Sequence, residues 1–291
     1  MNIGIIGLGL IGGSLGRAIL KKTPFKVFGY DISEDTMMKA GLLGAITAPL
    51  VSNADYENLD ILLICLNPKA TIVAMREASK KLKKGTTVMD IAGTKRGVLA
   101  EMKKLSEKYP LLKFIGTHPM AGKEFSGINH SSPLLFEKAS VLIAPVSADI
   151  ATLSEIKSLL TDIGFGFVKT TTGEEHDKII AYTSQLPHVI SSCFMLNPVC
   201  ELNEGFSAGS FRDLTRVAKL NPEMWAELFL ENRDNLINEI EIFVSKMNEV
   251  KAHLASGNEI DLTAHLLDCN AKKEQMDKQM RTWKKQNDEA N

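Results

Sequence analysis

Residues 2–12 read Asn2-Ile3-Gly4-Ile5-Ile6-Gly7-Leu8-Gly9-Leu10-Ile11-Gly12, an apolar run followed at once by a complete GxGxxG pattern. A helical pattern continues from Ser14 to Lys21, so the glycines lie between a strand and a helix. In such a unit Gly7 permits the tight turn, Gly9 lets the backbone approach a pyrophosphate, and Gly12 lets the helix pack closely on the sheet. We therefore expect a dinucleotide at this helix N-terminus, bound by Gly7, Leu8, Gly9, Leu10, Ile11 and Gly12.

The second apolar run ends at Asp31, nineteen residues after Gly12 and between the uncharged Tyr30 and Ile32. A carboxylate at this position accepts hydrogen bonds from the adenosine ribose hydroxyls and repels the 2′-phosphate of NADP. We therefore expect the cofactor NAD. Pro68 follows the third apolar run and is suited to the first position of a helix, which makes it a further candidate for the cofactor site.

As far as about residue 172, short apolar runs alternate with helical patterns. The runs are residues 2–7, 26–31, 60–66, 86–92, 111–116 and 140–145. Continuous apolar runs suit strands that are covered on both faces, and their alternation with helices implies a doubly wound, mostly parallel sheet. The sequence therefore predicts an α/β fold with an N-terminal Rossmann-type domain, residues 1–172.

From residue 173 to residue 291 the alternation stops and the chain reads as helix. The helical segments are residues 174–197, 211–220, 222 to about 255, and 261 to about 285. Pro187 removes a backbone hydrogen bond inside the first segment, which predicts a kink there. We expect residues 173–291 to form an all-α domain for substrate binding and dimerisation.

The third helical segment carries an apolar stripe with 4-3-4-3-4 spacing: Leu236, Ile240, Phe243, Met247, Val250 and Leu254. Such a stripe requires a partner helix, either within the domain or in a second subunit. We favour a homodimer, because a helical domain of roughly 120 residues has little core of its own.

Composition excludes several classes of protein. The chain has 291 residues, of which 44% are hydrophobic, and a formal net charge of -1, so no overall field draws it to nucleic acid or to an anionic membrane. The six glycines of the first twenty residues argue against a signal peptide, and no later apolar run is long enough to span a membrane without a charge. Four cysteines without CxxC spacing fit reduced thiols. We expect a cytoplasmic protein with a small-molecule substrate and no metal.

Chemistry is expected first at His118, in the segment Gly116 to Glu124 after the fifth apolar run. That position lies at the carboxyl edge of the sheet, where ligands of such folds bind. An imidazole can accept a proton from a hydroxyl while the carbon gives up hydride, a contribution of roughly 10²- to 10⁴-fold in rate. Without the cofactor motif, a histidine beside a proline is more often structural.

The helical segment around Arg212 and Arg216 offers cations to an acidic substrate, because a guanidinium binds a carboxylate through two hydrogen bonds. The alternative is that both arginines form surface ion pairs with Asp213 or Glu223. Charge pattern alone leaves these two interpretations equally open.

The chain resembles the prephenate dehydrogenase family of tyrosine biosynthesis from residue 1 to about residue 255. The motifs that carry this resemblance are GLGLIGGS (7–14), DIAGTK (90–95), GTHPMAGKEFSG (116–127), SQLPHVI (184–190), FRDLTRVA (211–218) and NPEMW (221–225). The segments HPMAG, LPH and DLTR in that order are far more specific than GxGxxG.

The resemblance implies an NAD-dependent oxidative decarboxylation of prephenate to 4-hydroxyphenylpyruvate. It implies that His118 is the catalytic base, that Arg216 binds a substrate carboxylate, and that His188 and Trp225 line the substrate pocket. It further implies that Glu124 and Asp213 pair with cationic groups at the mouth of the cleft. Many relatives carry a serine before the lysine of this loop, where this chain has Gly93-Thr94, so a substrate-facing hydroxyl either comes from Thr94 or is absent.

Three alternatives remain open. An arogenate dehydrogenase differs only in an amino group where prephenate has a keto group. A β-hydroxyacid dehydrogenase would need a catalytic lysine after the domain junction, and Lys178 lacks the surrounding pattern. A protein that only senses a dinucleotide would bind NAD through the glycine loop and have no turnover.

Overall fold

The computed structural model describes residues 1–202 and 204–288, and the chain forms two compact units, Met1–Asn232 and Arg233–Asn291. Within the described residues, eight strands of the first unit form one sheet in the order β3-β2-β1-β4-β5-β6-β7-β8. The strands are β1 (Asn2–Ile6), β2 (Lys26–Tyr30), β3 (Ala48–Pro49), β4 (Ile61–Ile64), β5 (Thr87–Asp90), β6 (Lys113–Met120), β7 (Ser140–Pro145) and β8 (Phe167–Thr170).

The sheet is parallel except where β7 runs antiparallel to β6. This arrangement confirms the α/β class and the Rossmann-type, mostly parallel sheet. The six apolar runs each contribute a strand. The sequence did not predict β3, which is two residues long, or β8, whose last two residues, Lys169 and Thr170, are exposed.

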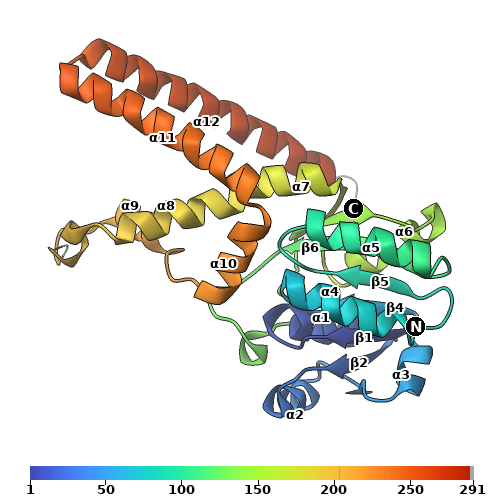
Figure 1. Ribbon diagram of the computed structural model, residues 1–291. Coiled ribbons are helices and arrows are strands. Elements are labelled where there is room, and N and C mark those ends of the chain that lie inside the picture. Colours follow the sequence, from blue (N-terminus) through green and yellow to red (C-terminus); the bar gives the residue numbers. More distant parts are fainter. Residues whose placement is uncertain (203, 289–291) are drawn as a thin grey trace. The chain divides into compact units, whose positions relative to one another are not determined.

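Helices cover both faces of the sheet (Figure 1). One core contains apolar side chains of α1 (Leu10–Lys22) and α6 (Ile150–Asp162), and the other contains those of α4 (Pro68–Ser79) and α5 (Arg96–Lys108). Within β4, Ile61 and Leu63 belong to the first core, whereas Leu62 and Ile64 belong to the second. This alternation explains why the strand reads as an unbroken apolar run. The shorter helices of this part are α2 (Glu34–Leu42), α3 (Asn53–Glu57) and η1 (Ile128–His130).

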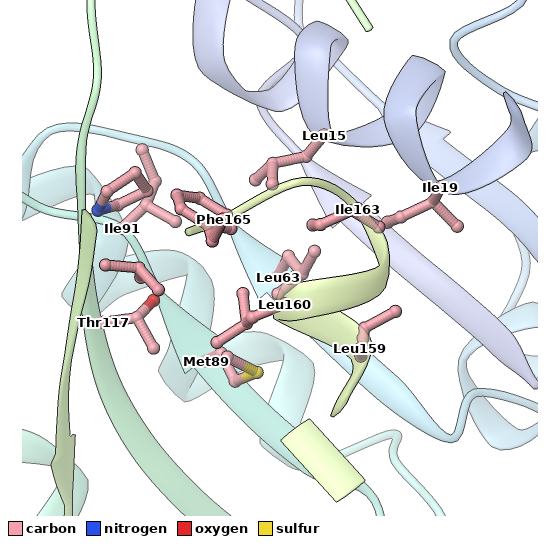
Figure 2. A pocket seen from close by; sticks show the side chains of 12 residues that line it. Leu15, Ile19, Leu63, Met89, Ile91, Thr117, Leu159, Leu160, Ile163 and Phe165 are labelled. Carbon is pink, nitrogen blue, oxygen red and sulfur yellow. The ribbon is translucent and has the colours of Figure 1, made fainter. Parts of the chain in front are cut away.

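A small cavity of about 20 Å³ lies within the first core. Figure 2 shows the side chains of Leu15 and Ile19 on one side and those of Leu159 and Ile163 nearby. Thr117 supplies the hydroxyl of this apolar lining, and that hydroxyl already donates a hydrogen bond to the carbonyl oxygen of Asp90. The cavity is a packing gap and lacks the convergent polar groups of a substrate site.

The rest of the first unit is helical. Helix α7 (Gly173–Ile180), the π-helical turn η2 (Ala181–Gln185) and α8 (Leu186–Met195) run end to end (Figure 1). The irregularity predicted from Pro187 is thus a π turn just before it, in which the N–H of Leu186 bonds to the carbonyl of Ala181. The remaining elements are η3 (Pro198–Leu202), α9 (Gly209–Thr215) and α10 (Pro222–Glu231).

The helix expected from residue 222 to about residue 255 is interrupted at Asn232, so that prediction was wrong. Asn232 leaves the helical conformation, with φ of -121° and ψ of 25°, and is completely buried. Its side-chain amide donates hydrogen bonds to the carbonyl oxygen of Asp177, at 2.7 Å, and to Oε1 of Gln185, at 2.9 Å. These tertiary hydrogen bonds outweigh the local helix preference.

The second unit consists of α11 (Arg233–Ser256) and α12 (Glu259–Asp288), which lie side by side (Figure 1). Of the apolar stripe on α11, Leu236 is buried, whereas Met247 and Leu254 expose 56% and 63% of their surface. Helix α12 therefore covers the stripe only in part. No helix in the described ranges is both long and apolar enough to cross a bilayer.

The predicted domain boundary at residue 172 falls between β8 and α7 and stays a prediction. The last three residues of the predicted helical domain, 289–291, lie outside the described residues. Cys193 lies in α8 and Cys200 in η3, so these two cysteines, seven residues apart, do not share a helix.

Candidate active site

The glycine loop has the geometry of a phosphate-binding turn. Gly7 has φ of +89°, and a Cβ on Gly12 would lie 1.9 Å from the carbonyl oxygen of Gly7. Around Gly9, by contrast, the described residues leave a Cβ position open to 4 Å. Among these residues no side chain caps α1, which begins at Leu10. The positive end of the helix dipole and its first N–H groups therefore suit a pyrophosphate that approaches over Gly9.

Asp31 lies directly beside this loop. Its Oδ2 accepts a hydrogen bond from the N–H of Leu8 at 2.8 Å, and its Oδ1 accepts one from the N–H of Ser33 at 3.0 Å. The carboxylate is thus held at the carboxyl end of β2, as the spacing predicts for a ribose-binding acid. Two apolar residues of the glycine loop were also predicted to bind the cofactor. Leu8 is fully buried and Ile11 is partly buried.

Pro68 is buried at the first position of α4. Strands β1 and β4 are parallel neighbours, so the N-termini of α1 and α4 lie at the same edge of the sheet. The glycine loop, Asp31 and Pro68 together fit the dinucleotide expected from the sequence.

His118 lies within β6 and not in a loop after the strand, which corrects the expectation. The strand continues to Met120 because its end pairs with the antiparallel β7, with His118 opposite Leu142. The imidazole is held from one side: its Nδ1 lies 2.8 Å from Nε2 of His176 in α7. The base predicted from the sequence is therefore hydrogen-bonded to a second histidine, 58 residues away in the chain.

His176 is in turn held by Asp177, whose Oδ1 accepts a hydrogen bond from His176 Nδ1 at 2.7 Å. Asp177 also accepts hydrogen bonds from the backbone N–H groups of Lys95, at 2.7 Å, and Arg96, at 2.9 Å. Both His176 and Asp177 are almost fully buried. Burial raises the pKa of Asp177, but these hydrogen bonds outweigh it and bring the pKa below its ordinary value, so the carboxylate is charged.

A buried ion pair also lies close to His118. Lys95 is 1% exposed and pairs through Nζ with the fully buried Asp90, whose carboxylate also accepts hydrogen bonds from the N–H groups of Ala92 and Thr117. Burial lowers the pKa of His118 well below its ordinary value, and it falls further because a proton on His118 would be repelled by a proton on His176 and by the Lys95 ammonium. His118 is consequently a neutral imidazole at neutral pH, as a proton acceptor must be.

The second group of predicted residues lies on the helices. His188 donates a hydrogen bond from Nδ1 to the carbonyl oxygen of Val217 at 2.9 Å, and its ring packs on Trp225 with 4.0 Å between ring centroids. Burial lowers the pKa of His188; the Val217 carbonyl raises it, and the charge of Arg216 lowers it again. Arg216 therefore lies close enough to His188 to act on it electrostatically.

Arg216 is exposed at the end of α9. Within residues 1–202 and 204–288, neither Arg216 nor Arg212 forms an ion pair with an acid, so the surface pairs with Asp213 or Glu223 do not occur. The guanidinium of Arg216 thus keeps its hydrogen-bond donors for an anionic ligand.

Helix α10 lies between the loop after β5, which carries Thr94, and the helices that carry His188 and Arg216. It carries Trp225, and its Leu228 packs on the loop after β5, where a Cβ on Gly93 would lie 3.1 Å from Leu228 Cδ2. Thr94 follows in this loop and is buried. Glu124, after β6, and Asp213, on α9, are both exposed, and among the described residues neither forms an ion pair with His118 or His188.

Sequence reasoning missed His176, Asp177, Asp90 and Lys95. A signal was present for the first two, because a His-Asp dipeptide follows the last strand by a few residues, where polar groups reach the carboxyl edge of the sheet. The buried amides of Gln185 and Asn232 carry no such signal, since their partners are distant in sequence.

A Rossmann-type sheet with a phosphate-binding turn and a neutral histidine at its carboxyl edge defines a class, the nucleotide-dependent dehydrogenases. Residues 15–169 match the family model described as prephenate dehydrogenase, nucleotide-binding domain. Residues 172–268 match prephenate dehydrogenase, dimerization domain. The chain belongs to the prephenate dehydrogenase family.

Known relatives agree with this. A prephenate dehydrogenase of Bacillus subtilis is 29% identical over 86% of this chain and 69% of its own length. A cyclohexadienyl dehydrogenase of Zymomonas mobilis is 31% identical over 88% of this chain and 89% of its own. The structure of prephenate dehydrogenase from Aquifex aeolicus in complex with hydroxyphenyl propionate and NAD+ matches with a TM-score of 0.81 and 29% identity, over 95% of this chain and 98% of that one.

Proposed function

We propose that this protein is an NAD-dependent prephenate dehydrogenase of tyrosine biosynthesis, which converts prephenate to 4-hydroxyphenylpyruvate and carbon dioxide. The observation that carries the proposal is the neutral, partly buried imidazole of His118 at the carboxyl edge of the sheet, on the same compact unit as the unpaired guanidinium of Arg216. The NAD+ in the Aquifex aeolicus structure supports NAD as the cofactor.

In this proposal His118 accepts the proton of the substrate's 4-hydroxyl while the ring carbon that bears this hydroxyl loses hydride. When bound, NAD supplies the acceptor for that hydride. The ring carboxylate then leaves as carbon dioxide, and the electron pair of the broken carbon–carbon bond completes the aromatic ring. The oxygen takes the proton back from His118 and becomes a phenol.

Substrate binding is assigned to Arg216, whose guanidinium pairs with a carboxylate of the substrate. His188 and Trp225 form an adjoining wall, because their rings are in contact and Arg216 lies beside His188. Thr94 is proposed to donate a hydrogen bond from its hydroxyl near the ring of the substrate.

The second candidate function is arogenate dehydrogenation. Arogenate carries an ammonium group, and the exposed acids Glu124 and Asp213 form no ion pair within the described residues. Either acid would favour that ammonium if it faced the substrate side chain. The similarity to a cyclohexadienyl dehydrogenase keeps this candidate alongside prephenate.

The proposal includes a homodimer in the cytoplasm. Support for the homodimer comes from the match to a dimerization domain and from the exposed apolar side chains of α11 and α12, among them Met247, Leu254, Leu266 and Leu267.

The test is the rate of NADH formation with prephenate and, separately, with arogenate. We expect a higher kcat/KM with prephenate, and turnover of arogenate alone would reverse the order of the two candidates. His118→Asn should lower kcat by roughly 10²- to 10⁴-fold and leave the dissociation constant of NAD unchanged. A protein that only senses the dinucleotide would turn over neither compound.

A further inference from the structure

The hydrogen bonds around His176 determine which of its ring nitrogens carries a proton. The Asp177 carboxylate is charged and can only accept, so His176 Nδ1 is the donor in their 2.7 Å contact. In a neutral His176 the other nitrogen, Nε2, is therefore bare and acts as an acceptor.

The same reasoning carries over to His118. Its Nδ1 faces the bare Nε2 of His176 at 2.8 Å, so His118 Nδ1 must be the donor of that hydrogen bond. Neutral His118 then has its lone pair on Nε2, the nitrogen that faces away from His176. This is the tautomer that a base needs in order to take a proton from a hydroxyl.

Asp177 is held too firmly to turn away from His176. Besides the imidazole, its two carboxylate oxygens accept hydrogen bonds from the backbone N–H groups of Lys95 and Arg96, which lie at the start of α5. Its own carbonyl oxygen accepts a hydrogen bond from the buried amide of Asn232. The acid is thus fixed by three separate segments of the chain.

We propose that His176 and Asp177 form a relay behind His118, which sets the His118 tautomer and takes over the positive charge when His118 receives a proton. The inference rests on the proposed function, in which His118 is the base. The incoming proton binds Nε2 of His118, the Nδ1 proton of His118 moves to Nε2 of His176, and the resulting imidazolium lies against the Asp177 carboxylate. The reverse shift returns the proton to the phenolic oxygen. His176 and Asp177 are positioning residues, since they act through His118.

Charged and titratable groups around His118 are few and known. His176 and Asp177 approach from α7, while Lys95 and its partner Asp90 approach from the start of α5 and from β5. The Arg96 side chain also approaches from the start of α5, with its Nε 3.3 Å from Oδ2 of Asp177. Lys95 is thus paired with Asp90 and Arg96 with Asp177, and the hydrogen-bonded path for a proton from His118 leads through His176 to Asp177.

The experiment compares two substitutions of His176 that differ in the acceptor. His176→Gln places an amide oxygen near the position of Nε2 and can still accept from His118, whereas His176→Leu fills similar space without an acceptor. We expect His176→Leu to lower kcat about 100-fold or more, within the range of general-base catalysis, and His176→Gln to recover a substantial part of that loss. In both variants the KM for substrate and the dissociation constant of NAD should change less than about threefold, because His176 has no role in binding substrate or NAD. His130→Gln, at the exposed end of η1, is the matched histidine control.

A second measurement needs no substrate. Nitrogen NMR of the full-length protein with 15N-labelled histidine reports which nitrogen of each ring is protonated. We expect neutral His118 in the wild type to be protonated at Nδ1 and bare at Nε2, and we expect the opposite tautomer to become populated in His176→Leu. Wild-type His118 with a protonated Nε2 would overturn the relay, and so would a His176→Leu variant with wild-type kcat.

The failure of the relay and the failure of the proposed function are distinguishable. If wild-type protein oxidises neither prephenate nor arogenate, the proposed function is wrong, and the NMR result alone decides whether the tautomer is set by His176. If wild-type protein is active but His176→Leu is equally active, only the relay is wrong.

Discussion

The carboxylate of Glu227 in α10 accepts a hydrogen bond from the backbone N–H of Lys69, 2.7 Å away, in the first turn of α4. Helix α4 begins with Pro68, which has no N–H, and its own N-cap residue Asn67 makes no side-chain cap. An acid from a helix 158 residues further along the chain therefore caps this helix and interacts favourably with its dipole. The contact ties α10, which carries Trp225, to the edge of the nucleotide-binding sheet.

Glu227→Ala should lower the free energy of unfolding by about 1 kcal/mol, the usual contribution of an N-cap. Glu227→Gln keeps an acceptor and loses only the charge, so its loss should be smaller. Denaturant unfolding of both variants measures the difference. Equal midpoints for Glu227→Ala and the wild type would mean that the contact contributes nothing to stability.

Gly9 and Gly12 should respond in opposite ways to the same added methyl group. Gly12→Ala brings a Cβ within 1.9 Å of the Gly7 carbonyl oxygen, so the free energy of unfolding should fall by at least about 2 kcal/mol. Gly9→Ala meets nothing within 4 Å among the described residues and should unfold like the wild type, while NAD affinity drops about tenfold or more. Calorimetric titration with NAD, paired with thermal unfolding, separates the two. A Gly9→Ala variant with unchanged NAD affinity would contradict the proposed path of the pyrophosphate.

The parts of the site that sequence predicts well are local in the chain. The glycine loop and Asp31 lie within about thirty residues of each other, and the turn geometry of a βαβ unit fixes their relation. The end of β6 was predicted less well, because its length depends on antiparallel pairing with the next strand, β7, in which Met120 lies opposite Ser140. His118 is consequently in a strand, although Pro119 favours a loop.

Long-range polar contacts are the part that sequence could not predict. Asn232 interrupts a strongly helical stretch because its amide bonds to Asp177 and Gln185, 55 and 47 residues away. The His-Asp dipeptide after the last strand indicates only that His176 lies near the carboxyl edge of the sheet, and its contact with His118, 58 residues away, is again a long-range one. Such contacts become visible only when the helices are placed against the sheet.

Arg216 and Arg212 lie one helical turn apart and provide a matched pair. Arg216→Ala should raise the KM for substrate about tenfold or more with little change in kcat, because the lost hydrogen bonds are made in the ground state and the transition state alike. Arg212→Ala removes the same charge from α9 and should change KM much less. Steady-state kinetics of both variants at saturating NAD provides the comparison. If Arg212→Ala has the larger effect, the carboxylate binds one turn earlier on the helix.

The stability of the fold should depend on pH through two partly buried histidines, His118 and His188. Burial lowers the pKa of His118 well below its ordinary value of 6.5 and also lowers that of His188. As pH falls below about 6.5, these two histidines bind protons in the unfolded chain but stay neutral in the folded protein, so the free energy of unfolding should decrease. The stabilising contribution of these neutral rings is complete above that pH and is lost as pH falls toward the folded-state pKa values. Urea unfolding at about pH 7.5 and about pH 5.5 measures the slope, which should be shallower in His118→Asn.

Asp31 is expected to decide between NAD and NADP. Asp31→Ser removes the carboxylate that accepts hydrogen bonds from the N–H groups of Leu8 and Ser33, together with the charge that repels a 2′-phosphate. NAD affinity should fall about tenfold and the preference for NAD over NADP should shrink, as measured by titration with each cofactor. Asp35→Ser removes an equal charge from the neighbouring helix, where Asp35 pairs with Lys39, and should leave both affinities unchanged. If Asp31→Ser keeps the wild-type preference, selectivity must arise from groups that bind the cofactor elsewhere.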